Sequence, residues 1–321
     1  MEKCYHSYIK KFQVLPKSTL YNEDSKYMIS EFNKHEATLY LIVKTPKIAF
    51  IPESFIIDDN YNLCGEVFIE NTETIKAIKF NPLKIPYDMP QLRNNYPTLE
   101  SFINTYMDMY EDGNKSNKQK YKDLSSIDLN NSNESKLRIK CPISKAVTRG
   151  EGDYMDLKIY QVINFFNIDI LQNLEILYIG KSNDNTWQRL YSHNKWGFLE
   201  EYRNKAKEDF LVYFLQLDYS KLEINKINNF AILNRGDDTQ ITLEDATKIT
   251  EASLINYFIK EKKFNDQMVN MDLSKWYFIK TKLKNNGYTE VNVELYLDGL
   301  FGKLGTDNTK YKGYHNMKYK I

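Results

Sequence analysis

Arg189 and His193 are the first pair in this sequence whose types and spacing could do chemistry. They are four positions apart, so on a helix their side chains point the same way. A guanidinium matches two oxygens of a phosphate, and a histidine exchanges protons near neutral pH. The pair therefore predicts a group that could bind a phosphate through Arg189, with His193 beside it. The alternative is a surface arginine and a histidine stacked on Trp196.

Tyr178 and Gly180 stand just before this pair, at the end of the apolar stretch LEILYIG. Alternate residues of a strand share a face, so these two lie on one side of it and Ile179 lies on the other. A glycine there allows a ligand or another backbone to come close. The alternative is an ordinary strand end, because the turn formers Ser182 and Asn183 follow.

Glu251 is the third candidate, and it lies in the segment EASLINYF. On a helix it shares a face with Thr247, Leu254, Ile255 and Phe258. A carboxylate inside an apolar stripe is costly unless it is paired or binds a metal. The segment therefore predicts a carboxylate that is either paired or bound to a metal, and the alternative is a glutamate at the edge of the stripe that reaches solvent.

These residues need a scaffold of strands and helices, and the sequence pattern predicts one. Residues 174–180 and 209–219 are apolar and β-branched, as strands are. Residues 242–263 predict a helix that opens with Thr242 and Asp245, the spacing of a capping box. Further elements are expected as β-rich structure at 36–82, a helix at 97–110, an interrupted helix at 185–206 and a strand at 289–297.

The composition sets limits on function. The chain has 321 residues and a formal net charge of +1, so nucleic-acid binding would have to come from a local basic surface. Lysines and an arginine that could contact phosphates follow His193: Lys195, Arg203, Lys205 and Lys207. The three cysteines form no C-x-x-C pair, which favours a reducing compartment. No signal peptide or membrane span is visible, so we expect a cytoplasmic protein without a membrane partner.

Domain boundaries are expected from a change in composition. Residues 111–136 are almost all Asn, Ser, Lys, Asp and Glu, and such a segment buries too little apolar surface to order itself. We therefore expect a β-rich N-terminal domain over 1–110, a polar linker or long loop over 111–138 and a second domain over 139–321.

The order of the candidate residues resembles the GIY-YIG nuclease family. YIGKS is followed by Arg189, His193, Glu251 and then Asn265 in KKFNDQ, and the resemblance covers about residues 155–270. The family's first strand normally carries G-I-Y shortly before YIG, and no such motif precedes Tyr178. The nearest candidate is Lys158-Ile159-Tyr160, with lysine in place of glycine.

The resemblance implies a fold, a reaction and residue roles. The fold class would be α+β, a small antiparallel sheet flanked by helices, preceded here by a separate β-rich domain. The family hydrolyses phosphodiesters with one divalent ion, so Glu251 would bind Mg²⁺ or Mn²⁺ and Arg189 would clamp the phosphate. Tyr178, aided by Tyr160, would orient or deprotonate the attacking water. The remaining implied site residues are Lys181, His193 and Asn265.

The expected function is a metal-dependent endonuclease acting on DNA, with RNA as a further substrate class and a homodimer as an expected assembly. The alternatives are a nuclease-like protein that binds nucleic acid without cutting, and a protein-interaction module. The absent GIY motif favours the first alternative. Tyr178, Arg189 and Glu251 together oppose it.

Overall fold

The computed structural model describes residues 2–22, 32, 37–144, 152–170, 173–182, 189–190, 193–227, 230–237, 239–259 and 277–321. The chain forms two compact units, and each is described by itself. Unit 1 combines Met1–Thr45 with Leu171–Ile321, and unit 2 is Pro46–Ile170. Unit 2 is thus inserted between two parts of unit 1, an arrangement that differs from the expected succession of 1–110, 111–138 and 139–321.

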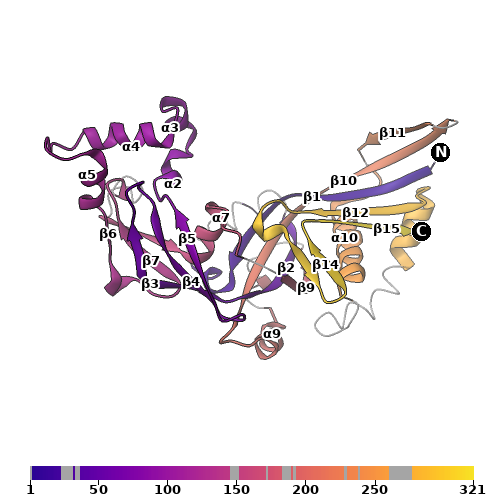
Figure 1. Ribbon diagram of the computed structural model, residues 1–321. Coiled ribbons are helices and arrows are strands. Elements are labelled where there is room, and N and C mark those ends of the chain that lie inside the picture. The colour runs from indigo at the N-terminus through magenta and orange to yellow at the C-terminus, as the bar shows by residue number, and fades with distance from the viewer. Residues whose placement is uncertain are drawn as a thin grey trace. The chain divides into compact units, whose positions relative to one another are not determined.

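Unit 1 is built on one large mixed sheet (Figure 1). Within the described residues it has nine strands, in the order β14-β13-β9-β2-β10-β1-β12-β15, with β11 paired to β10. The strands are β1 (Glu2–Pro16), β2 (Ala37–Pro46), β9 (Leu174–Lys181), β10 (Glu208–Ile227), β11 (Phe230–Gly236), β12 (Glu290–Tyr296), β13 (Leu304–Thr306), β14 (Thr309–Lys312) and β15 (Tyr314–Lys320).

The expected small antiparallel sheet flanked by helices is wrong, because strands from both ends of the chain extend this sheet. β1 pairs antiparallel with the long strand β10 and parallel with β12, while β9 pairs antiparallel with β2 and parallel with β13. Strands β1 and β2 therefore belong to the same sheet as the YIG strand. They do not belong to a separate preceding domain. A pattern confined to 155–270 could not show these distant pairings.

One long helix, α10 (Leu243–Phe258), packs on the sheet of unit 1 and confirms the expected helix at 242–263 as far as the structure describes it, since residues 260–263 lie outside the described residues. Thr242 caps it: its side chain accepts the Asp245 N–H at 3.2 Å, and the Asp245 carboxylate reaches back to Thr242. Residues 277–285 are also helical. The remaining short elements of unit 1 are α9 (Trp196–Tyr202), η1 (Lys17–Thr19) and η3 (Leu300–Gly302).

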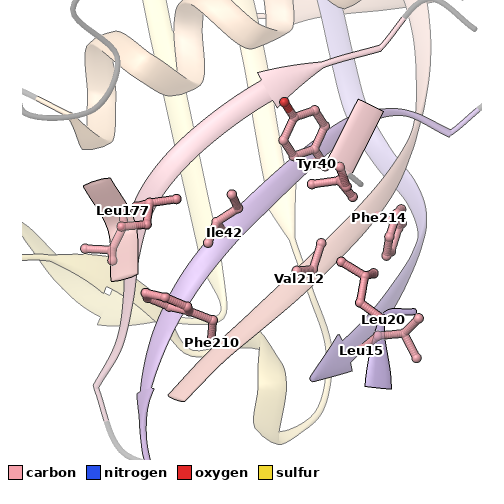
Figure 2. Packing of buried hydrophobic residues seen from close by; sticks show 10 residues of the cluster. Leu15, Leu20, Tyr40, Ile42, Leu177, Phe210, Val212 and Phe214 are labelled. Carbon is pink, nitrogen blue, oxygen red and sulfur yellow. The ribbon is translucent and has the colours of Figure 1, made fainter. Parts of the chain in front are cut away.

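An apolar cluster fills the region between β2, β9, β10 and the segment around α9 (Figure 2). Alternation along β10 places Phe210, Val212 and Phe214 on one face, against Tyr40 and Ile42 of β2. Its other members are Leu15, Leu20, Leu177, Leu190 and Leu199. The cluster fixes the strand that carries Tyr40 and the segment that leads to α9.

Unit 2 contains two three-stranded sheets, of order β3-β4-β5 and β6-β7-β8 within the described residues. The strands are β3 (Ile48–Ile57), β4 (Leu63–Ile69), β5 (Thr74–Phe80), β6 (Ser126–Ile127), β7 (Lys136–Lys140) and β8 (Tyr154–Lys158). The helices are α2 (Lys84–Tyr87), α3 (Pro90–Asn95), α4 (Leu99–Asp108), α5 (Asn117–Leu124), α7 (Ile159–Phe165) and η2 (Leu129–Asn131).

The polar segment 111–138, expected as a linker, supplies ordered elements of unit 2. Ser116 and Gln119 form a capping box that starts α5, and Tyr121 of that helix is 2% exposed. Its ring packs edge-on against Tyr61, with centroids 5.1 Å apart. One buried aromatic ring and local capping thus order a segment whose mean composition is polar. In the part of the chain that the structure describes, no helix has the length and apolar character needed to cross a membrane.

Candidate active site

Two tyrosines from neighbouring strands stack at the centre of the candidate site. Tyr40 on β2 and Tyr178 on β9 have ring centroids 6.0 Å apart and planes inclined by 25°. The register pairs Tyr40 with Gly180, which places the two tyrosines diagonally on one face. In Figure 2 the Tyr40 ring lies against the apolar cluster and its hydroxyl points away from it.

Gly180 makes room for this pair. A Cβ built at position 180 would lie 2.5 Å from Cζ and the hydroxyl oxygen of Tyr40, and 2.7 Å from Cε1 of Tyr178. Side-chain atoms do not approach a Cβ so closely, so any larger residue would displace a tyrosine. The glycine of the YIG motif therefore serves ring packing at this position.

His193 completes an aromatic group with the two tyrosines. Its ring meets Tyr178 edge-on, with centroids 4.8 Å apart, and Tyr40 at 5.9 Å. Its Nδ1 accepts the backbone N–H of Lys195 at 3.2 Å, so in the neutral imidazole the proton is on Nε2. Nε2 is buried and has no hydrogen-bond partner among the described residues. It is therefore a buried donor whose hydrogen bond is not made within the described part of the chain.

Trp196 holds the backbone that carries His193. Its indole N–H donates to the Leu190 carbonyl oxygen at 2.8 Å, and its own backbone N–H donates to the His193 carbonyl oxygen at 3.2 Å. Leu190 is fully buried in the apolar cluster. The tryptophan that sequence analysis placed near His193 thus fixes this turn and also packs against the ring, with centroids 5.9 Å apart.

Arg189 lies at the solvent side of the same group. Its side chain is exposed, yet its charge lowers the pKa of Tyr40 and of His193, which places the guanidinium near both. The Tyr40 hydroxyl is buried and makes no hydrogen bond of ordinary geometry to a described residue. An exposed cation beside an unpartnered hydroxyl is an arrangement that could receive an anion.

Glu251 approaches the tyrosines from α10. Its side chain is buried, at 3% exposure, and its carboxylate contributes to raising the pKa of Tyr178. Two hydroxyl contacts fasten α10 on either side of the face that bears Glu251. Thr247 Oγ1 lies 2.9 Å from Thr38 Oγ1 on β2, and Thr250 Oγ1 lies 2.8 Å from Ser7 Oγ on β1.

The protonation states follow from burial first and from charge second. Burial raises the pKa of Tyr178, and Glu251 adds to this, whereas Tyr40 and Arg189 oppose it. Burial, Arg189 and Lys195 lower the pKa of His193 to about 4. At neutral pH the tyrosines are thus protonated and His193 is neutral, so Arg189 is the cation of this group.

A divalent ion would have one protein carboxylate here. No group of three or more His, Cys, Asp or Glu side chains suited to a metal occurs in the described ranges. One carboxylate is enough for a Mg²⁺ ion that takes its other ligands from substrate phosphate and water. The donor set therefore suits Mg²⁺ bound jointly with a phosphate and would not form a closed protein cage.

Four of the residues expected at the site come together: Tyr178, Arg189, His193 and Glu251. Lys181 lies near the start of α10, where it contributes, after Lys248, to lowering the pKa of Glu244. Asn265 lies outside the described residues.

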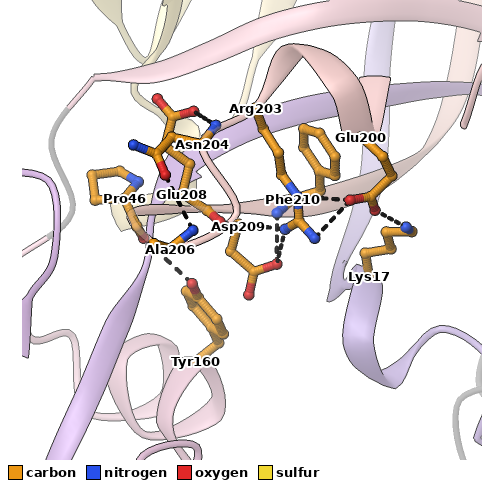
Figure 3. Close-up of polar contacts among 10 residues, drawn as sticks. All are labelled: Lys17, Pro46, Tyr160, Glu200, Arg203, Asn204, Ala206, Glu208, Asp209 and Phe210. Carbon is orange, nitrogen blue, oxygen red and sulfur yellow. Dashed lines mark hydrogen bonds and ion pairs between the residues drawn. The ribbon is translucent and has the colours of Figure 1, made fainter. Parts of the chain in front are cut away.

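Tyr160 belongs to α7 in unit 2. Its hydroxyl donates to the Pro46 carbonyl oxygen at 3.4 Å, as Figure 3 shows. The tyrosine that stacks on Tyr178 is Tyr40, which sequence analysis missed. Its signal is the β-branched and aromatic strand ATLYLIVKT, which contains Tyr40 and lies before the range 155–270 that the resemblance covers. The insertion of unit 2 between β2 and β9 separates the two tyrosines in sequence.

An ion-pair network fixes α9 beside the site (Figure 3). Glu200 pairs with Lys17 and with Arg203, whose guanidinium is 2.8 Å from the carboxylate. Arg203 also reaches Asp209 at 3.3 Å and lies over the Phe210 ring at 4.8 Å. Arg203, expected from sequence as a phosphate contact, is therefore engaged within the protein.

The comparisons with known proteins add no assignment. The sequence matches no protein-family model, no curated protein and no solved structure.

Proposed function

We propose that this chain is a metal-dependent endonuclease that hydrolyses phosphodiester bonds in DNA. One observation carries the proposal: five residues from distant parts of the chain lie near one another beside β2 and β9 of unit 1, namely Tyr40, Tyr178, Arg189, His193 and Glu251. Aromatic hydroxyls, a neutral imidazole donor, a guanidinium and a carboxylate can each contribute to phosphodiester hydrolysis, as proton-transfer groups, phosphate ligands or a metal ligand. Their order along the chain also resembles the GIY-YIG nucleases.

Each residue has a role that its environment supports. Arg189 is exposed, so it can meet the phosphate and stabilise charge that grows on its oxygens. The Nε2–H of His193 can donate to a phosphate oxygen or to a tyrosine hydroxyl. Tyr178 and Tyr40 orient the attacking water. The water oxygen bonds to phosphorus and gives up one proton, the bond to the leaving oxygen breaks, and that oxygen takes up one proton, so that one water is added across the P–O bond.

Glu251 would hold the metal. The ion supplies positive charge that stabilises the phosphate and lowers the pKa of a bound water. The chain itself contributes the placement of the carboxylate, through the Thr38–Thr247 and Ser7–Thr250 contacts on α10. Because Tyr178 has a raised pKa, its deprotonation at neutral pH would require the charge of Arg189 and of the ion together.

A second function is favoured by one observation. Glu251 is 3% exposed, and a carboxylate so enclosed leaves little room for the waters of a Mg²⁺ ion. A protein that binds nucleic acid through Arg189 without cutting it would keep this geometry. The absent GIY motif favoured this non-cutting function from sequence. Tyr40 opposes it, because it places a second tyrosine beside Tyr178.

Cleavage assays on the full chain test the proposal. Wild type, Glu251→Gln and Tyr40→Phe would be incubated with supercoiled plasmid and short oligonucleotides in Mg²⁺, Mn²⁺ or EDTA. The matched control is Glu244→Gln, an exposed carboxylate on the same helix. The proposal expects cutting by wild type and Glu244→Gln, and loss with EDTA or Glu251→Gln. Binding without cutting in any metal would establish the second function.

A further inference from the structure

The outer face of α9 carries two exposed aromatic side chains next to the candidate site. Phe198 is 60% exposed and Tyr202 is 40% exposed, and a spacing of four puts them on one helix face. The opposite face packs inward, with Leu199 fully buried and Trp196 against the apolar cluster. Phe198 and Tyr202 together form an aromatic strip that core packing does not explain.

A lysine ammonium lies near each ring of this strip, and the one near Tyr202 is paired with two glutamates. The Lys195 ammonium is 5.4 Å from the centroid of the Phe198 ring, and the Lys44 ammonium is 5.3 Å from that of Tyr202. Lys195 also donates its backbone N–H to His193 Nδ1. The strip is therefore continuous with the candidate active site at its Lys195 end.

The strip is held in place by contacts beneath it. Glu200, within α9, pairs with Lys17 of η1 and with Arg203, which in turn pairs with Asp209 of β10 (Figure 3). Lys44 is fixed by Glu175 at 2.8 Å and by Glu208 at 3.2 Å. A platform whose position is set beforehand loses little freedom when a ligand stacks on it.

We propose that Phe198 and Tyr202 form a stacking platform for unpaired bases of a nucleic-acid strand whose backbone passes Lys195 on its way to Arg189. Bases within a duplex stack on one another, whereas unpaired bases offer their faces to aromatic side chains. Glu201 is exposed next to Tyr202 and repels phosphate there, so the backbone belongs at the Lys195 end. The substrate would thus have unpaired nucleotides beside the phosphate that is cut.

This inference rests on the proposed function for the class of ligand, but it concerns binding and does not require cutting. Fluorescence anisotropy in EDTA would measure the affinity of the full chain for end-labelled oligothymidylate, oligouridylate and a duplex of similar length. The variants are Phe198→Ala with Tyr202→Ala, and the conservative pair Phe198→Tyr with Tyr202→Phe. The control is Phe278→Ala, another exposed aromatic residue of unit 1.

The double alanine variant should bind single strands about tenfold more weakly, as expected for the loss of base stacking. Duplex binding, the conservative pair and Phe278→Ala should match wild type. Comparison of the deoxy and ribo strands then assigns DNA or RNA. An alanine variant that binds single strands like wild type, or that loses duplex binding equally, overturns the platform.

Three outcomes separate this inference from the nuclease proposal. Wild type that binds no nucleic acid would end both. Wild type that binds through the strip without cutting in any metal would end only the nuclease. The third outcome is that Glu251→Gln abolishes cutting while the alanine changes at Phe198 and Tyr202 leave single-strand binding unchanged. That result would end only the platform.

Discussion

Tyr40 and Gly180 face each other across β2 and β9, and the tyrosine ring occupies the space that a side chain at position 180 would need. This relationship links two stretches of sequence that unit 2 separates. It also gives the YIG glycine a physical role, because its missing side chain is what lets Tyr40 stack on Tyr178. The geometry of the candidate site therefore depends on a close contact at one cross-strand pair.

Gly180→Ala should damage the site more than the fold. The new Cβ would displace the Tyr40 ring, and overpacking of a buried region costs roughly 1–3 kcal/mol of unfolding free energy. Denaturant unfolding would measure that cost and a cleavage assay would measure the loss of activity. Gly197→Ala is the control: nothing lies within 4 Å of its Cβ, and alanine should stabilise α9 by up to about 1 kcal/mol. Full activity in Gly180→Ala would contradict the packing argument.

Tyr40→Phe should lower the cleavage rate, whereas Tyr160→Phe should not. Both changes remove one hydroxyl and keep the ring. The Tyr40 hydroxyl is buried beside Arg189 and has no partner of ordinary hydrogen-bond geometry in the described ranges, so stability should change little. The Tyr160 hydroxyl bonds the Pro46 carbonyl oxygen in unit 2. Single-turnover rates at saturating metal would compare the two variants, and a larger loss in Tyr160→Phe would refute the assignment of Tyr40.

The sequence showed local structure well and distant pairing poorly. Helix α10 and its Thr242 cap were predicted because hydrophobic period and capping are encoded within a few residues. The convergence of Tyr178, Arg189, His193 and Glu251 was predicted only through resemblance to a family. Spacing alone does not say which strands meet.

Two errors have one physical cause, which is that strand pairing is set by contacts between distant residues. The strand Glu2–Pro16 pairs with Glu208–Ile227 and Glu290–Tyr296, and nothing in its own pattern specifies these partners. The same holds for Tyr40, because all of unit 2 lies between its strand and that of Tyr178 in the sequence.

The polar segment 111–138 differs from the expected linker for another reason. Its mean composition is polar and hides single buried residues such as Tyr121.

His193 should make the protein less stable as the pH falls. Its pKa is lowered from 6.5 to about 4 in the folded state, so between these values the unfolded chain binds more protons. Above about pH 6.5 the lowered pKa of His193 does not change the free energy of unfolding. As the pH falls to near 4, it lowers that free energy by about 3 kcal/mol. Denaturant unfolding at several pH values would compare wild type with His193→Gln. The difference between the two should change over this range, and a difference independent of pH would show that folding does not lower the pKa of His193.

Thr247 should govern how well Glu251 is placed for a metal. Its hydroxyl donates to the Leu243 carbonyl oxygen at 2.8 Å, so the Thr38 hydroxyl supplies the hydrogen between the two threonines. Thr247→Val removes that contact, leaves the Thr38 hydroxyl without its partner and should cost about 1–2 kcal/mol. Thr247→Ser keeps the hydroxyl and should restore both stability and placement.

The measurement for Thr247 is the Mg²⁺ concentration that gives half-maximal cleavage, taken together with the melting temperature. Thr247→Val should raise that concentration several-fold while Thr247→Ser stays near wild type. Thr281→Val is the matched control. The Thr281 hydroxyl also donates to a carbonyl oxygen one turn earlier in its helix, that of Tyr277 at 2.8 Å, but Thr281 is exposed. If Thr247→Val melts earlier yet keeps its Mg²⁺ dependence, the threonine supports α10 without positioning Glu251.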